Sequence, residues 1–350
     1  MLRRNKFFFP VLIVLLIVML LCAVAFGAVS IKVSAMFSAI AHYFQGKSPA
    51  TIYEGVFLQI RLPRVLLCAI TGAILSSSGV LMQGLFRNPI VEPGLVGTSA
   101  GAAFGASIVF VLAGSMSIGM KEIAGPLLVP LFAFAGGLLA TFLVYSLAKS
   151  VQKISITSLL LIGIAVNAIG LSGTGFMSYI ARDPQARSIT FWNLGTFTGA
   201  TWTQVFITGA VAAIIFSIAL RYSKQLNALL LGEEEASYLG VDTEKLKRRI
   251  MILNTAMVAV ATAFVGVISF MGLIVPHILR LMIGSDNKKL LPASMLLGAI
   301  LLTLADMAAR LLLAPAEIPI GIITSIVGAP VFIILLKKFS ILQEKGGFYA

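Results

Sequence analysis

Charged side chains are scarce in this sequence. Only 11% of its 350 residues are Asp, Glu, Lys or Arg, whereas 59% are hydrophobic, and the mean hydropathy is +1.03. A soluble globule of this length needs far more polar surface than such a composition can supply. The composition therefore excludes a soluble globular protein and predicts an all-α protein that crosses a membrane many times.

Cysteine and histidine are almost absent. Cys22 and Cys68 lie within apolar runs and show no C-x-x-C spacing, so neither a disulfide framework nor a cysteine metal site is expected. His42 and His277 stand far apart in the chain. We therefore expect no metal ion held by side chains of this protein.

Long apolar runs are abundant. A helix needs about 20 residues to cross ~30 Å of hydrocarbon, and by this measure the sequence predicts ten spans, of which the eighth is short. Together they predict one transmembrane domain over residues 1–350 with no large soluble appendage. The expected spans are 7–29, 63–84, 94–114, 126–148, 155–180, 203–221, 250–269, 273–284, 291–313 and 319–337.

Basic residues outnumber acidic ones, which gives a net charge of +13. With ten crossings, most of the 26 lysines and arginines fall on the side of Arg3, Arg4 and Lys6. Cytoplasmic loops of membrane proteins carry this excess of basic residues. The charge therefore predicts that both termini are cytoplasmic, and we expect no nucleic-acid partner.

The stretch RNPIVEPGLVGTSAGAAFG, residues 87–105, interrupts two apolar runs. Proline removes backbone hydrogen bonds from a regular helix, and closely spaced glycines let another helix or a substrate approach the backbone. Irregular backbone near membrane depth requires protein or water to satisfy its polar groups. The stretch is either a gate or an ordinary turn followed by a packed helix. The candidate gate residues are Asn88, Pro89, Pro93, Gly94 and Gly97.

Four long stretches, in this order, resemble the FecCD-type permeases, the membrane subunits of ABC importers for ferric siderophores, heme and vitamin B12. They are RLPRVLLCAITGAILSSSGVLMQGLFRNPIVEPGLVGTSAGA, LGEEEASYLGVDTEKLKRR, GLIVPHILRLMIGSDNKKLLPAS and ADMAARLLLAPAEIPIGIITSIVGAPVF. The resemblance implies the fold of the vitamin B12 importer permease, with about ten transmembrane helices and short broken helices, in the bacterial inner membrane. It also implies a role without covalent chemistry.

The same resemblance implies a set of partners. They are a second copy of the chain, two ATP-binding cassette ATPase subunits and a periplasmic substrate-binding protein, all in contact with membrane lipid. ATP and magnesium would bind to the ATPase, and no cofactor to this chain. The phosphate-loop-like stretch AHYFQGKS, residues 41–48, lacks the first glycine and the preceding strand, so it predicts no nucleotide site.

Residues 221–249 form the longest cytoplasmic excursion. Acidic residues after Gly232 and basic residues before Ile250 suit the dipoles of two short helices, the second capped by Asp242. The resemblance implies that these are coupling helices that dock on the ATPase, and the alternative is a solvated loop. The expected coupling residues are Glu233, Glu234, Glu235, Ala236, Leu239, Gly240, Val241 and Asp242.

Arg61 and Arg64 are expected on the outer side, where the charge rule disfavours them, and the resemblance adds Arg310 to them. The resemblance implies that they receive carboxylates of the periplasmic binding protein. Two alternatives remain open: snorkelling of the arginines to the interface, and pairing of Arg310 with Asp306 four residues earlier on the same helix.

Two further segments are expected to line the pathway. The outer segment 181–202 resembles the family's short helix at the outer entrance, with Phe191 and Trp192, although aromatic anchoring at the interface would also explain the tryptophan. On the inner side, Ser155, Thr157 and Ser158 are small polar residues that could close a constriction. The outer segment favours heme as cargo, and ferric siderophores, vitamin B12 and ion-coupled secondary transport remain alternatives.

Overall fold

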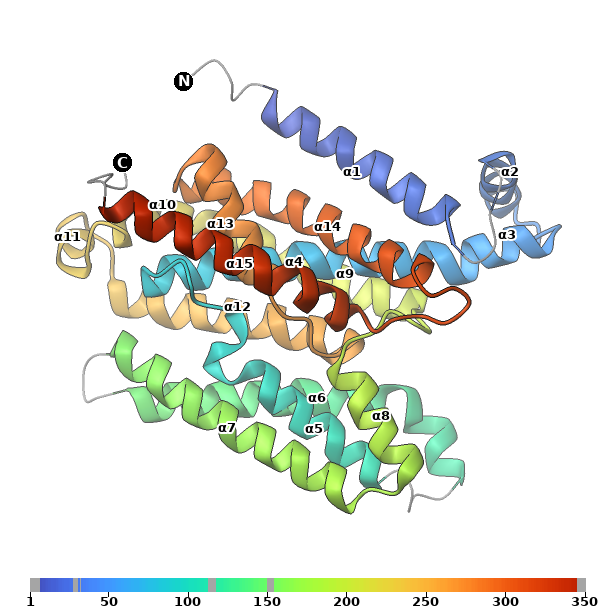
Figure 1. The fold of residues 1–350 in the computed structure, drawn as a ribbon, viewed down its shortest axis with the longest axis horizontal. Coiled ribbons are helices and arrows are strands. Elements are labelled where there is room, and N and C mark those ends of the chain that lie inside the picture. Colours follow the sequence, from blue (N-terminus) through green and yellow to red (C-terminus); the bar gives the residue numbers. More distant parts are fainter. Residues whose placement is uncertain (1–6, 28–30, 32, 113–117, 150–153, 345–350) are drawn as a thin grey trace.

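The computed structural model describes residues 7–27, 31, 33–112, 118–149 and 154–344 (Figure 1). Within these ranges the chain is almost entirely helical, apart from an isolated antiparallel bridge between Lys149 and Ile154. The elements are α1 Phe8–Ala25, α2 Val33–Phe44, α3 Ile52–Val56, η1 Phe57–Arg61, α4 Leu62–Phe86, η2 Pro93–Val96, α5 Thr98–Leu112, α6 Ile118–Ala148, α7 Ile156–Ile180, α8 Asp183–Asn193, α9 Trp202–Arg221, α10 Ser223–Leu229, α11 Glu233–Tyr238, α12 Thr243–Val265, α13 Met271–Ile283, α14 Asn287–Leu311 and α15 Ile320–Glu344.

The predicted all-α membrane fold is confirmed. Seven helices of the described chain are long and apolar enough to cross a membrane, and three shorter apolar helices, Thr98–Leu112, Met271–Ile283 and Ile320–Ile334, occupy the remaining predicted spans. The eighth span is short, as expected, because α13 ends at Gly284 in a left-handed conformation with φ 83°. Glycine adopts this conformation without steric cost.

The helices lie roughly along one direction, with α11 at one end of the bundle and α2 and α3 at the other (Figure 1). The first residues of α1 and the last of α15 lie towards the α11 end (Figure 1). Helices α5, α6, α7 and α8 form one layer of the bundle, and α6 packs against α12 of the other.

Helix α4 forms the centre of the bundle and packs against α14, α13, α12 and α9. A Cβ atom at Gly72 would collide with the backbone carbonyl of Gly298 on α14, and one at Gly79 with that of Gly272 on α13. Lipid tails are as apolar as leucine, so helices in a membrane associate through such close backbone contacts. Small residues on α4 therefore allow α13 and α14 to pack closely against it.

Two sequence-based boundaries need correction. The predicted separate short helix over residues 242–249 is wrong, since Asp242 caps α12, which continues without interruption to Val265. Its charged first turns extend a helix that is long and apolar enough to cross a membrane, and α10 and α11 are the short helices described between α9 and α12. The third predicted span starts late, because residues 93–96 form η2 and α5 begins at Thr98.

Candidate functional site

Residues 87–97 form an irregular connection between α4 and α5. Arg87 ends α4 in the left-handed region with φ 51°, and Gly97 ends η2 with φ 91°. From the α11 end of the bundle the segment turns back inward to the start of α5 (Figure 1). All five gate residues predicted from the sequence lie on this connection, and Pro93 and Gly97 are buried.

Two asparagine side chains donate hydrogen bonds to backbone carbonyls of the break. Asn254 of α12 is fully buried and donates to the carbonyl of Pro93 at 3.3 Å. Asn167 of α7 donates to the carbonyls of Gly94 at 3.4 Å and Leu95 at 3.1 Å. Both amides therefore stabilise irregular backbone in a region with little water.

The neighbouring helices fix the same segment through further polar contacts. The Glu92 carboxylate accepts a hydrogen bond from the backbone N–H of Phe270, the N-cap of α13, at 3.2 Å. Ser78 of α4 donates to the side-chain oxygen of Asn254, so one amide links α4, α12 and η2. Sequence reasoning missed both asparagines as site residues. An amide within an apolar spanning run was the signal that could have found them.

A cavity of about 480 Å³ borders this segment. Its walls come from the break, from α5, α7 and α8, and from the connection between α12 and α13. The polar residues of its lining are Glu92, Ser99, Asn167, Thr174, Asn193 and Ser269. The predicted gate segment thus forms one wall of a partly polar chamber within an apolar bundle.

The inner predicted residues lie at the start of α7. The Ser155 side chain caps this helix by accepting a hydrogen bond from the N–H of Ser158 at 3.2 Å. Ser155 and Thr157 are exposed, and Ser158 is half-buried. They do not line the cavity at the break, so their role at a constriction stays a prediction.

The predicted coupling residues lie on α11 and on its connection to α12. Ala236 is fully buried and anchors α11, whereas Tyr238 is 89% and Leu239 64% exposed. Glu234 and Glu235 are also exposed. Helix α11 therefore presents both apolar and acidic side chains outward at one end of the bundle, which is a surface that a protein partner could bind.

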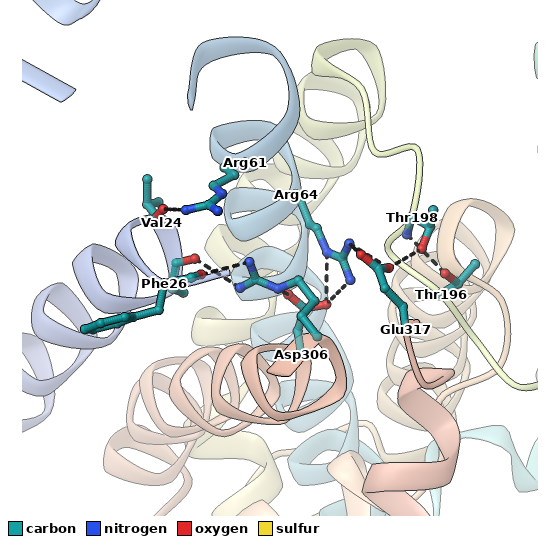
Figure 2. Close-up of polar contacts among 10 residues, drawn as sticks. Val24, Phe26, Arg61, Arg64, Thr196, Thr198, Asp306 and Glu317 are labelled. Atoms are coloured by element: carbon teal, nitrogen blue, oxygen red, sulfur yellow. Dashed lines mark hydrogen bonds and ion pairs between the residues drawn. The ribbon is translucent and has the colours of Figure 1, made fainter. Parts of the chain in front are cut away.

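The three outer arginines are buried, and described residues of this chain already bind each of them (Figure 2). Arg61 donates to the carbonyls of Val24 at 2.7 Å and Ala25 at 2.8 Å, and Arg310 donates to those of Ala23 at 3.0 Å and Phe26 at 3.3 Å. These carbonyls end α1, which has no basic residue in its own last turn. Two arginines from other helices thus cap α1 and suit its dipole.

Arg64 lies between two carboxylates (Figure 2). Its guanidinium donates to Asp306 at 2.9 and 3.1 Å and to both carboxylate oxygens of Glu317 at 2.9 Å. Arg310 forms an ion pair with the other Asp306 oxygen at 3.0 Å, although the two groups are not aligned for a hydrogen bond. Pairing of Arg310 with Asp306 was one of the alternatives that the sequence left open. Docking of a partner's carboxylates on these arginines stays a prediction.

Glu317 connects this cluster to the segment that follows α8. Thr198 donates a hydrogen bond to its carboxylate at 2.7 Å. Burial alone would raise the pKa of Glu317, but the hydrogen bond from Thr198 and the guanidinium of Arg64 hold that pKa below its ordinary value of 4.5. The carboxylate therefore stays charged to a lower pH than an ordinary glutamate does.

The outer short helix is α8, within the predicted range 181–202. Phe191 is half exposed, and the backbone after Trp192 bonds to two neighbouring helices: Leu194 accepts from the N–H of Gly321 at 2.7 Å, and Thr196 donates to Val265 at 2.9 Å. Neither predicted aromatic residue lines the cavity at the break, although Asn193 does. Their place on the pathway stays a prediction.

Comparisons with known proteins agree with this architecture. A model of the FecCD transport family matches residues 15–338. The hemin transport system permease protein HmuU of Yersinia pestis is 37% identical over 332 residues, which cover 93% of this chain and 94% of that protein. A vitamin B12 import system permease protein of Vibrio parahaemolyticus is 35% identical over 292 residues, 83% of this chain and 86% of that one.

A solved structure supports the same relationship. A metal-chelate type ABC transporter in an inward-facing conformation superposes with a TM-score of 0.81 and 32% sequence identity. The match covers 95% of this chain and 99% of the other. Sequence and structure therefore point to the same group of membrane proteins.

Proposed function

The chain belongs to the FecCD transport family and is a multi-pass permease of an ABC importer, and we propose that it moves an iron complex, with heme the favoured cargo, from the periplasm to the cytoplasm. The observation that carries this proposal is the family match over residues 15–338, which includes the break, α11 and the outer arginine cluster. The permease itself performs no covalent chemistry.

The working importer contains two copies of this chain, two ATPase subunits that bind ATP and magnesium, and a periplasmic binding protein. The exposed Tyr238 and Leu239 beside the acidic first turn of α11 support docking of an ATPase at that end. Most basic residues fall on the same side. This agrees with a chain in the bacterial inner membrane whose termini are cytoplasmic.

The segment 88–97 is the inner gate of the pathway, and the cavity beside it is the part of the pathway that one copy contributes. Pro89, Pro93 and Gly97 keep the segment out of a regular helix, and the two asparagine amides hold it in one place. Such a segment can move without breaking a long spanning helix, because it contains only the short turn η2 between α4 and α5.

Heme is favoured over vitamin B12 by the resemblance of the outer segment 181–202; overall identity does not favour heme, since the hemin permease is 37% identical and a vitamin B12 permease of Salmonella paratyphi A is 40% identical. Both relatives are similar enough for the fold to serve either cargo. Ferric siderophores belong to the same class of bulky metal chelates. Cargo choice is therefore the part of the proposal that needs measurement.

The test is uptake into proteoliposomes that contain the permease, its ATPase and its binding protein, with heme, a ferric siderophore and vitamin B12 offered in parallel. We expect ATP-dependent accumulation of heme. Accumulation of vitamin B12 but not of heme would show that vitamin B12 is the cargo instead. Accumulation that needs no ATPase but follows an ion gradient would contradict the importer mechanism itself.

Variants at the two proposed docking surfaces complete the test. Glu234→Lys should abolish association with the ATPase, and Arg61→Glu should abolish association with the binding protein. Because Arg61 also caps α1, thermal unfolding of that variant must be measured beside binding. Loss of binding by a folded Arg61→Glu protein supports docking, and intact binding contradicts it.

A further inference from the structure

A fully buried lysine lies behind the exposed surface of α11. Lys247, in the second turn of α12, is 1% exposed, and its ammonium group donates to Glu233 at 2.7 Å and to Glu244 at 2.9 Å. Glu233 is the first residue of α11, whereas Glu244 lies on α12 itself. A buried charge is costly unless it is paired and hydrogen-bonded. The position of α11 is therefore tied to the need of Lys247 for a partner.

The same ammonium group also binds the connection between α6 and α7. Lys247 donates to the backbone carbonyl of Ile154 at 3.1 Å, and Glu244 accepts from the N–H of Ile154 at 2.8 Å. Ile154 is buried and also forms the bridge to Lys149, at the end of α6. Both backbone polar groups of one residue are thus held by the lysine and its carboxylate partner.

Ile154 directly precedes Ser155, the N-cap of α7. Further along α7, Asn167 holds the carbonyls of Gly94 and Leu95 in the gate segment. A continuous series of polar contacts and one rigid helix therefore leads from Glu233 on α11 to the inner gate. Energetic coupling between distant sites is carried by such contiguous contacts when they have two arrangements.

We propose that Lys247 is a positioning residue that joins α11 to the start of α7, so that a displacement of α11 moves α7 and, through Asn167, the gate segment 88–97. This inference rests on the proposed docking of an ATPase on α11. The charges suit this role. Lys247 is shared by two carboxylates on different helices, and it would lose one of its two charged partners if Glu233 moved away with α11.

The first experiment measures ATP hydrolysis and heme uptake of the complete importer in the same proteoliposomes. Lys247→Met should still bind the ATPase and support hydrolysis, but uptake per ATP hydrolysed should fall by about two- to thirtyfold, the range expected for one residue of a coupling network. Lys247→Arg retains the charge and should restore most of the coupling. Unchanged uptake per ATP in Lys247→Met would overturn the proposal.

Lys245→Met is the matched control. Lys245 lies two residues before Lys247 on α12, but its side chain is 62% exposed and its ion-pair partner is Asp242 at 2.8 Å. This variant should couple hydrolysis to uptake as the unmodified protein does. If Lys245→Met uncouples the importer as strongly as Lys247→Met, general disturbance of the segment explains the effect and the proposal is wrong.

A second experiment does not depend on the ATPase or on activity. Spin labels at Tyr238→Cys on α11 and Leu161→Cys on α7, with Cys22 and Cys68 replaced by alanine, report the distance between the two helices. The labelled chain is diluted with unlabelled chain so that only pairs within one copy are measured. Lys247→Met, or the milder Glu233→Gln, should broaden this distance distribution, and an unchanged distribution in both would contradict the proposed connection.

The two experiments separate the possible failures. If Glu234→Lys leaves ATPase binding intact, docking on α11 fails, while the distance measurement still tests whether Lys247 joins α11 to α7. If docking holds and the distance distribution broadens but coupling is unchanged, the connection exists and does not transmit the movement, which contradicts the proposal itself.

Discussion

Arg64 donates two hydrogen bonds to a single oxygen of Asp306, at 2.9 and 3.1 Å, although the two residues stand 242 positions apart in the chain. Asp306 also faces Arg310, and Arg64 also binds Glu317. The cluster therefore joins α4, α14 and the loop before α15 at the outer end of the bundle. The stability of the fold therefore depends on these buried ion pairs as well as on helix packing.

Asp306→Asn should destabilise the protein markedly. Asp306 is 1% exposed and lies between two arginines, so its loss takes the facing carboxylate from Arg310 and leaves Arg64 with Glu317 alone. Breaking a buried pair in this way costs about 3–5 kcal/mol. Thermal unfolding in detergent measures the effect. Asp242→Asn, which disrupts an exposed pair with Lys245, is the control and should change stability far less; equal effects would mean that the cluster contributes little.

Stability should fall at low pH partly through Glu317. Its pKa lies below the ordinary value of 4.5 in the folded protein, so its contribution is present above that value and is lost as the pH drops through the folded-state pKa. The Glu317→Gln variant should lack this part of the pH dependence. Unfolding curves at several pH values between neutral and acid measure it, and parallel curves for the two proteins would contradict the role of this carboxylate.

Asn254→Leu should loosen the gate. The substitution leaves the Pro93 carbonyl and the Ser78 hydroxyl without their partner, at a cost of about 1–3 kcal/mol for each buried group. We expect ATP-independent leakage of a small solute from loaded proteoliposomes. Thr255→Val is the matched control, because its hydroxyl bonds only to Met251 within the same helix. Tight vesicles with Asn254→Leu would show that this amide does not hold the gate closed.

Gly79→Ala should disturb the contact between α4 and α13. A methyl group there would meet the carbonyl of Gly272, and backbone cannot move as a side-chain end can. Overpacking of this kind costs about 1–3 kcal/mol. Gly209→Ala on α9 is the control, since its Cβ would lie 3.5 Å from Ile70, an ordinary contact. Unfolding temperatures of both variants decide whether close backbone packing is required at Gly79.

Much of the fold could be predicted from local pattern. Apolar runs predicted ten spans, and the described chain has seven helices long enough to cross a membrane and three shorter apolar helices at those places. Proline and glycine located the break at residues 88–97. Both predictions succeed because the cost of placing polar backbone or charge in hydrocarbon is a property of each segment alone. The start of α12 was missed because charged residues were expected to lie outside the spanning helix. Lys247 is polar in the sequence, yet it is buried in the structure and belongs to a continuous helix.

The candidate site could be predicted only in part. The sequence identified Arg61 and Arg64 as unusual for the outer side, and the resemblance added Arg310. Neither showed that Arg61 and Arg310 cap α1, because capping depends on where the end of another helix lies. It also left Asn167 and Asn254 unnoticed as the partners of η2. Each of these contacts joins segments that are far apart in the sequence, and whether they meet depends on how the helices cross.

By itself, the sequence determined that this protein crosses the membrane many times, where its helix breaks and which family it resembles, and it predicted an orientation. These properties follow from composition, spacing and the transfer of residues into hydrocarbon, and they need no knowledge of neighbouring helices. Only the tertiary structure decided which buried charges meet. Close approach of α4 and α14 at Gly72 and Gly298 brought Arg64 to Asp306, and the low polarity of the interior makes this pairing a requirement of the fold.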